Sequence, residues 1–303
     1  MTRWSVLLAA VGICMAADPG GGPPWQPGRG GTILRAHAGA TLRVMSWNIE
    51  RGVRFAEIRQ HLGREAADLL LLQEADWEAR RSGGRRIAEE LASALGLEWV
   101  FAPEFLELGQ RIRGKDAWHG QATLARLPVR AARLLHFRVQ SASWRPKPWL
   151  PHWSVFQPRE GGRLALITEH TAAGVPLIAY NLHLESRGAE ELRLGQIREV
   201  LEDARHAPPG AVVLIAGDFN TKTGAASPVI REILAEGFFV AAGGDITTKR
   251  GQALDWIFVR GPARASGARI RNDVRPADHY PVEVTVEILP VGRASHGSAA
   301  GSL

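Results

Sequence analysis

Eight polar side chains stand at the ends of hydrophobic runs that read as strands. They comprise four carboxylates, two imidazoles and two amides: Glu74, Asp218, Asp255, Asp278, His183, His279, Asn48 and Asn220. A donor set without cysteine favours a hard divalent cation such as Mg²⁺, Mn²⁺ or Ca²⁺ over zinc. A metal and a charged imidazole would neutralise phosphoryl oxygens, while a carboxylate would handle a proton. The residue types therefore favour metal-assisted phosphoryl chemistry.

Taken alone, each of these residues has an ordinary structural explanation. Asp218 in the stretch GDFN fits an Asx-turn, and a Glu after a strand is usually a surface acid or a helix cap. Together they are more informative, because polar groups beside buried strands are costly unless they are paired or serve a ligand. Loops held by rigid strands are also where functional sites are usually found.

The elements that must position these residues are strand-like runs interspersed with a few helical patterns. The hydrophobic runs predict strands at 41–47, 68–73, 99–102, 122–125, 163–168, 177–182, 212–216, 254–259, 268–271 and 282–288. Amphipathic patterns predict helices at 55–64, 85–95, 192–204 and 228–235, with Gly96 as a C-cap. Many strands among few helices indicate two sheets packed face to face with helices outside.

Length and composition indicate one large domain with extensions at both ends. The chain has 303 residues and a net charge of +6, with 45% hydrophobic residues, as in ordinary globular proteins. We assign residues 1–17 to a leader segment, 18–39 to a Pro/Gly-rich linker, 40–289 to the domain and 290–303 to a flexible tail. A single cysteine, Cys14, excludes internal disulfides.

The leader segment leaves two locations open. An apolar run at 4–16 follows Arg3 and ends at Ala16 and Ala17, as in a secretory signal. Export to the periplasm or the medium is one interpretation. The other is a cytoplasmic protein whose first residues are an unstructured leader or result from an upstream start codon.

Six stretches carry a resemblance to the endonuclease/exonuclease/phosphatase, or DNase I-like, superfamily. They are SWNIERG (46–52), LLLLQEAD (69–76), YNLHLES (180–186), GDFN (217–220), LDWIFV (254–259) and ADHYPV (277–282), in the family's order. The resemblance implies an α/β (α+β) four-layer sandwich in which two mostly antiparallel sheets pack face to face between helices. It also implies hydrolysis of phosphate esters with Mg²⁺ or Mn²⁺.

The resemblance further assigns roles to the metal-site residues. Glu74 is similar to the family's main metal ligand, and Asn48 and Asp278 assist it directly or through water.

Among the hydrolytic residues, Asp218 resembles the group that orients or deprotonates the attacking water, and Asn220 the group that holds the phosphate or that water. His279, polarised by Asp255, resembles the imidazole that faces the phosphate, and His183 a further donor. Whether Asp218 or His279 is the base stays open.

The substrate is less well defined. Residues 136–162 form a long loop or irregular hairpin in which Trp144, Trp149, Trp153 and Phe156 alternate with Arg145, Lys147, Arg159 and prolines. Such a loop could stack nucleic-acid bases, seat at a lipid interface or pack on the domain itself. A second basic cluster, formed by Arg51, Arg54, Arg80, Arg81, Arg85 and Arg86, gives modest support to a polyanionic substrate.

We therefore expect a monomeric, metal-dependent phosphodiesterase or nuclease, with nucleic acid as the first-choice substrate. One alternative is a sphingomyelinase-like phospholipid phosphodiesterase that contacts a membrane through the 136–162 loop. A less favoured one is a catalytically silent binding module on the same fold.

Overall fold

A computed structural model describes residues 26–141, 144, 149–150 and 153–290. The predicted leader, Cys14 and almost all of the predicted tail lie outside the described residues. Within the described part of the chain, no helix is long and apolar enough to span a membrane.

The first sheet has eight strands and contains the N-terminal motifs. Its order is β1 (Gly28–Gly31), β4 (Glu98–Glu107), β5 (Trp118–Ala125), β3 (Leu69–Trp77), β2 (Thr41–Asn48), β14 (Val282–Ile288) and β13 (Ala263–Ile270), and β7 (Arg159–Gly161) also pairs with β4. All neighbours are antiparallel except β2 and β3.

The second sheet has six strands and contains the central motifs. Its order is β11 (Phe239–Ala242), β12 (Asp255–Arg260), β10 (Val212–Asp218), β9 (Val175–His183), β8 (Leu164–Ala172) and β6 (Ala131–His136). Here β9 and β10 are the parallel pair, and the other neighbours are antiparallel.

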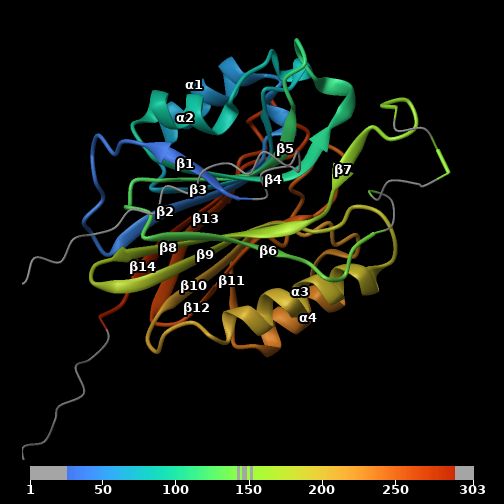
Figure 1. The fold of residues 1–303 in the computed structure, drawn as a ribbon. Helices are drawn as coiled ribbons and strands as arrows, with labels where there is room; N and C mark the ends of the chain where they lie inside the picture. Colours follow the sequence, from blue (N-terminus) through green and yellow to red (C-terminus); the bar gives the residue numbers. More distant parts are fainter. Residues whose placement is uncertain (1–25, 142–143, 145–148, 151–152, 291–303) are drawn as a thin grey trace, which may run out of the picture.

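Helices cover the outer face of each sheet, so the molecule has four layers (Figure 1). α1 (Phe55–Glu65) and α2 (Ile87–Leu95) lie on the first sheet, and α3 (Glu190–Ala204) and α4 (Pro228–Ala235) lie on the second. Between the sheets, aliphatic side chains such as Val44, Leu71 and Leu214 form the central core. The predicted sandwich of two mostly antiparallel sheets flanked by helices is confirmed.

All four predicted helices are present within a few residues of their expected bounds. The predicted stop at Gly96 is also confirmed, because Gly96 takes a left-handed φ of 66° and its N–H donates to the Ala92 carbonyl. At the other end of a helix, Ser227 caps α4 by accepting from the Val229 N–H, and Pro228 occupies the first turn.

The two parallel pairs bring the site residues to one edge of the sandwich. In the first sheet Asn48 is paired with Gln73, and in the second Asp218 is paired with His183 on one side and Asp255 on the other. β12 starts where β10 ends, because these two strands are antiparallel. The same holds for β14 and β2, so the 277–282 stretch lies at this edge too.

A buried polar contact joins the two sheets beneath this edge. The Gln73 Nε2 donates to the Asn181 Oδ1 at 2.7 Å, and the Asn181 Nδ2 donates to the carbonyls of Leu72 at 3.0 Å and Ala122 at 2.9 Å. Both side chains have no exposed surface. Polar groups this deep are stable only when hydrogen-bonded, so this contact fixes how the sheets face each other.

Four strands lie outside the sequence prediction. β1 falls within the segment predicted to be a linker. It could not be predicted as a strand because its glycines pair with β4 through the backbone and carry no side-chain pattern. A Cβ at Gly30 would lie 3.1 Å from the Trp99 ring, so glycine allows this close approach. β6, β7 and β11 are short or partly exposed and lack a strong hydrophobic run.

We expect Asn181→Ala to lower the free energy of unfolding by about 3 kcal/mol or more, because it removes three buried hydrogen bonds and leaves the Leu72 and Ala122 carbonyls without this side-chain donor. Urea denaturation measures this change. The control is Asn272→Ala, whose exposed side chain should contribute less than about 0.5 kcal/mol. Equal losses for the two variants would contradict the structural role of the contact.

Candidate active site

A buried Asp–His–Asp arrangement lies at the edge of the sandwich where the strands end. The His279 Nδ1 lies 2.8 Å from the Asp255 Oδ2, and its Nε2 lies 3.7 Å from the Asp218 Oδ2. The backbone of His279 is held as well, since the Trp47 Nε1 donates to its carbonyl at 3.0 Å. Strands from both sheets therefore fix one imidazole between two carboxylates.

This arrangement sets the charges of its members. Burial disfavours the imidazolium, but the Asp255 and Asp218 carboxylates outweigh it and raise the pKa of His279 to about 10. Burial, together with the charge on Asp255, raises the pKa of Asp218 to about 7 despite the opposing effect of His279. At neutral pH His279 is therefore a cation, and Asp218 is balanced between its two protonation states.

Two amides and a second imidazole surround Asp218. The Asn48 Nδ2 donates to its Oδ2 at 3.2 Å, the Asn220 N–H donates to its Oδ1 at 2.9 Å, and the His183 Nε2 lies 3.5 Å from Oδ2. Asn220 has a positive φ of 50°, consistent with the turn that directs its amide to the Leu184 carbonyl. Burial, and next the charge on Arg163, hold the pKa of His183 well below its usual value, so this ring is neutral.

Glu74 lies at the border of this network rather than inside it. A bulge in β3 between Leu72 and Ala75 and a φ of 54° orient Glu74 differently from its strand neighbours. Its carboxylate lies 3.6 Å from an Arg51 nitrogen, and 18% of its side chain is exposed. Burial opposes ionisation, but His119 and Arg51 lower the pKa of Glu74, so it is an anion at neutral pH.

Of the eight site residues predicted from sequence, six are in direct contact with one another, and two are linked to them only by charge. Hydrogen bonds and ion pairs connect Asn48, His183, Asp218, Asn220, Asp255 and His279 into one network. Glu74 and Asp278 are linked to it electrostatically: His279 lowers the pKa of Glu74, and Asp278 contributes to raising the pKa of His279.

The chemistry of these donors fits a divalent cation. Glu74 presents an ionised carboxylate to a pocket, and the Asp255 Oδ1 is buried without a hydrogen-bond partner. Ligand atoms of Asp218, Asp255 and His279 all lie within 4.8 Å of one another. Because His279 is itself charged there, Glu74 is the better anchor for the ion.

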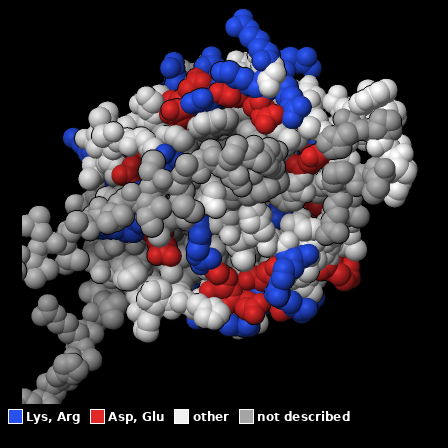
Figure 2. All heavy atoms as spheres, viewed as in Figure 1, with Lys and Arg blue, Asp and Glu red and all other residues white. Residues whose placement is uncertain are grey.

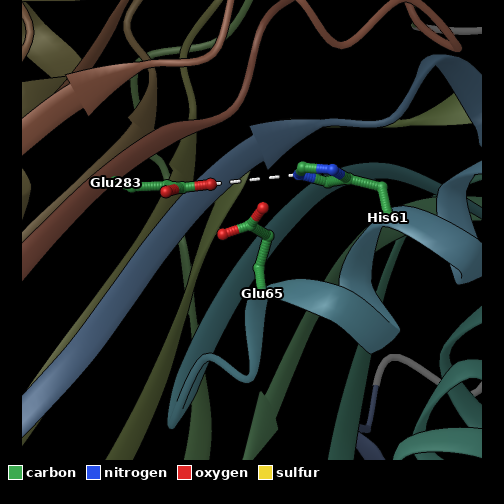
Figure 3. A group of neighbouring side chains, drawn as sticks. All are labelled: His61, Glu65 and Glu283. Atoms are coloured by element: carbon green, nitrogen blue, oxygen red, sulfur yellow. Dashed lines mark ion pairs between the residues drawn. The ribbon is translucent and has the colours of Figure 1, made fainter.

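A second cluster, shown in Figure 3, joins His61 and Glu65 of α1 to Glu283 of β14. The His61 Nε2 lies 3.9 Å from the Glu283 Oε1. An Arg271 nitrogen lies 2.5 Å from a Glu65 oxygen and 3.5 Å from a Glu283 oxygen. A guanidinium thus already supplies the positive charge, and the cluster is an ion-pair network.

The predicted basic cluster is divided by the fold. Arg54, Arg85 and Arg86 pair with nearby glutamates on the surface, and Arg80 donates to the Gly109 carbonyl. In Figure 2, basic and acidic side chains are mixed at the top of the view, where α1 and α2 lie in Figure 1. Arg51 and Arg81 instead line a pocket of about 360 Å³ that borders Glu74.

Three further arginines line this pocket: Arg159, which belongs to the predicted 136–162 loop, and Arg163 and Arg187, for which we predicted no role. Sequence offered little signal for them, because arginines are frequent throughout the chain. Trp144 also lines the pocket and is only 7% exposed, so it packs on the domain. Trp149 and Trp153 are 77% and 66% exposed, and Arg145 and Lys147 lie outside the described residues.

Comparison with known proteins identifies the family of the chain. The model of the Endonuclease/Exonuclease/phosphatase family matches residues 45–279. No match to a curated protein was found.

Among solved structures, an endonuclease/exonuclease/phosphatase from Beutenbergia cavernae is similar at 17% identity, with a TM-score of 0.61, over 82% of this chain and 72% of that one. A family protein from Leptotrichia buccalis is similar at 14% identity, with a TM-score of 0.58, over 82% and 100%. Truncated Caenorhabditis elegans TDP2 is similar at 21% identity, with a TM-score of 0.52, over 82% and 97%.

The His279–Asp255 pair can be tested by titration of the metal-free protein. Asp255→Asn keeps the shape but removes the nearest anion, so we expect the pKa of His279 to fall from about 10 by roughly one to two units. NMR titration of labelled histidine measures it. In wild type, the interactions that raise the pKa of His279 stabilise the folded state. Their contribution is complete below about pH 6.5 and is lost as the pH rises through 10.

The variant should therefore show a weaker pH dependence of unfolding between pH 7 and 10. Asp245→Asn, on an exposed residue, is the matched control. An unchanged His279 titration in Asp255→Asn would show that this carboxylate does not set the imidazole's charge.

Proposed function

The chain belongs to the endonuclease/exonuclease/phosphatase family, and on that premise we propose that it is a divalent-metal-dependent phosphodiesterase that cleaves nucleic acid by in-line attack of water. Members of this family are generally metal-dependent phosphoesterases. The observation that carries the proposal is the Asp218–His279–Asp255 arrangement next to Glu74.

Asp218 is the proposed base. Its pKa of about 7 suits a group that takes a proton from water near neutral pH. The Asn220 N–H and the Asn48 amide hold its two oxygens in place, so the carboxylate has a fixed direction. A cation bound beside it would lower its pKa and keep it ionised.

His279 is the proposed electrophilic donor. Asp255 keeps it charged, and its Nε2 points to the side where Asp218 lies. An imidazolium in a buried site strongly stabilises the negative charge that develops on phosphoryl oxygens. Neutral His183 adds a second donor on the same side.

A divalent cation would be held by Glu74, with Asn48 and Asp278 as further ligands, and would supply Lewis-acid neutralisation of phosphoryl oxygens. The Asn48 Oδ1 accepts from the Glu50 N–H at 3.1 Å, which holds this amide in a fixed direction.

Nucleic acid is the preferred substrate because the pocket that borders Glu74 is lined by five arginines. The second candidate is a phospholipid phosphodiesterase. It is favoured by the exposure of Trp149, Trp153 and Val155, the last at 81%, on the 136–162 loop.

We expect Asp218→Asn to reduce kcat for bis(4-nitrophenyl) phosphate by about a thousandfold, because the base is lost while the fold is kept. The Asp245→Asn control should retain wild-type rates. EDTA should abolish turnover by wild type, and Mg²⁺ or Mn²⁺ should restore it. Wild-type kcat in Asp218→Asn would contradict its role as base.

The substrate class is tested with the same preparations. Plasmid nicking that requires metal and Asp218 supports the nuclease, whereas choline-phosphate release from sphingomyelin vesicles with intact DNA supports the lipid enzyme. No turnover of any of these substrates would contradict the proposed catalysis.

Glu74→Gln tests the metal anchor. We expect the Mg²⁺ concentration for half-maximal activity to rise roughly tenfold or more, because a charged ligand is replaced by a neutral one. The control is Glu57→Gln, on an exposed residue of α1. An unchanged metal requirement would place the ion elsewhere.

A further inference from the structure

Next to Glu74 lies a pocket, here called the arginine pocket, with a volume of about 360 Å³. Its cationic lining comes from five arginines: Arg51, Arg81, Arg159, Arg163 and Arg187. Its acidic lining is Glu74 and Glu107, and the Trp144 side chain also contributes to the wall. Segments far apart in sequence thus place a surplus of positive charge beside the proposed metal ligand.

Buried and partly buried carboxylates hold three of these arginines in fixed positions. Arg81 makes two contacts of 2.8 Å with Asp76, and an Arg159 nitrogen lies 2.8 Å from a Glu107 oxygen. Arg163 lies 3.2 Å from Glu104, which is fully buried. The guanidiniums are therefore organised in advance, without a ligand.

Their charge is nevertheless not fully neutralised. Arg163 is only 3% exposed, yet its Nε has no hydrogen-bond partner. Burial and the neighbouring guanidiniums of Arg81 and Arg163 lower the pKa of Arg159, which reflects crowding of like charges. Among the described residues, no carboxylate lies within ion-pair distance of Arg187, which is exposed. An anion would relieve this crowding.

The pocket is built to recognise charge rather than a base. The guanidinium carbons of Arg159 and Arg187 lie 5.2 Å and 4.8 Å from the Trp144 ring centroid. The Trp144 Nε1 also donates to the Glu185 Oε2 at 2.9 Å. Because this ring is buried and already in contact with two cations, it is not available for stacking with a nucleobase.

The pocket adjoins the proposed catalytic centre through Glu74 and the chain segment that follows β9. The strand β9 ends at His183, and the same chain segment continues through Glu185, which holds Trp144, to Arg187 in the pocket. Glu74 is shared, because it lines the pocket and is electrostatically coupled to both Arg163 and His279. A group bound there would be a neighbour of the scissile phosphate.

We propose that the arginine pocket is a second anion subsite, which takes a non-scissile phosphate of a nucleic-acid strand adjacent to the bond being cleaved. This inference rests on the proposed function. It implies that the enzyme prefers diesters that carry a further phosphate over diesters that carry none.

The test compares three dinucleotides that differ only in a terminal phosphate: TpT, pTpT and TpTp. We expect wild type to show a kcat/KM roughly tenfold or more above that of TpT for one phosphorylated form, from charge-assisted contacts with guanidiniums. The phosphorylated form that is preferred also identifies the side of the scissile bond on which the pocket lies.

In Arg187→Gln this preference should fall to about threefold or less, mainly through KM. Arg187 is the best position to change because no buried carboxylate depends on it. Arg264→Gln, on exposed β13, removes the same charge elsewhere and should keep the wild-type preference. Equal kcat/KM for all three dinucleotides, or a full preference in Arg187→Gln, would overturn the proposal.

Binding to the metal-free protein separates this inference from the catalytic proposal. Calorimetry with thymidine 3′,5′-bisphosphate should show affinity that drops roughly tenfold in Arg187→Gln and not in Arg264→Gln. Binding without turnover of any diester would refute the proposed catalysis and keep the anion subsite. Turnover without Arg187-dependent binding or preference would refute the subsite alone.

Discussion

The site depends on one constraint: the strand ends of the two sheets must lie side by side and keep a fixed relative position. The Gln73–Asn181 hydrogen bond provides it, because each residue belongs to a parallel strand pair and the contact crosses the core. One residue beyond Gln73 lies Glu74, and two residues beyond Asn181 lies His183. A shift between the sheets would therefore separate Asn48, Glu74 and His279, on or next to strands of the first sheet, from Asp218 and Asp255 of the second sheet.

Burial at this edge determines the chemistry as much as the residue types do. His279 is charged and Asp218 titrates near neutrality because the two share a low-dielectric environment with Asp255. At the surface, the same side chains would have ordinary pKa values and weak mutual interaction. In the second cluster, by contrast, the Arg271 guanidinium already supplies the countercharge to Glu65 and Glu283.

Most strands and the position of the proposed catalytic residues could be predicted from sequence, because both depend on short local patterns. Long hydrophobic runs such as 69–72 and 212–216 predict strands, and the polar residues that follow them predict the edge. β1 could not be predicted because glycines pair through the backbone alone. The arginine pocket could not be predicted either, because Arg163 and its partner Glu104 lie 59 residues apart and only the fold brings them together.

On the proposed function, the 136–162 loop is where substrate choice would be decided, and its parts have different surroundings. Near its start, Trp144 is buried, bound to Glu185 and in contact with Arg159 and Arg187, so this part belongs to the wall of the arginine pocket. Farther along, Trp153 and Phe156 are exposed and stack on each other at 6.1 Å. An aromatic pair in solvent suits an apolar or stacking partner, whereas the pocket suits a phosphate. A nucleic-acid strand carries both chemistries in one chain, with bases beside phosphates, and would use both parts of the loop at once.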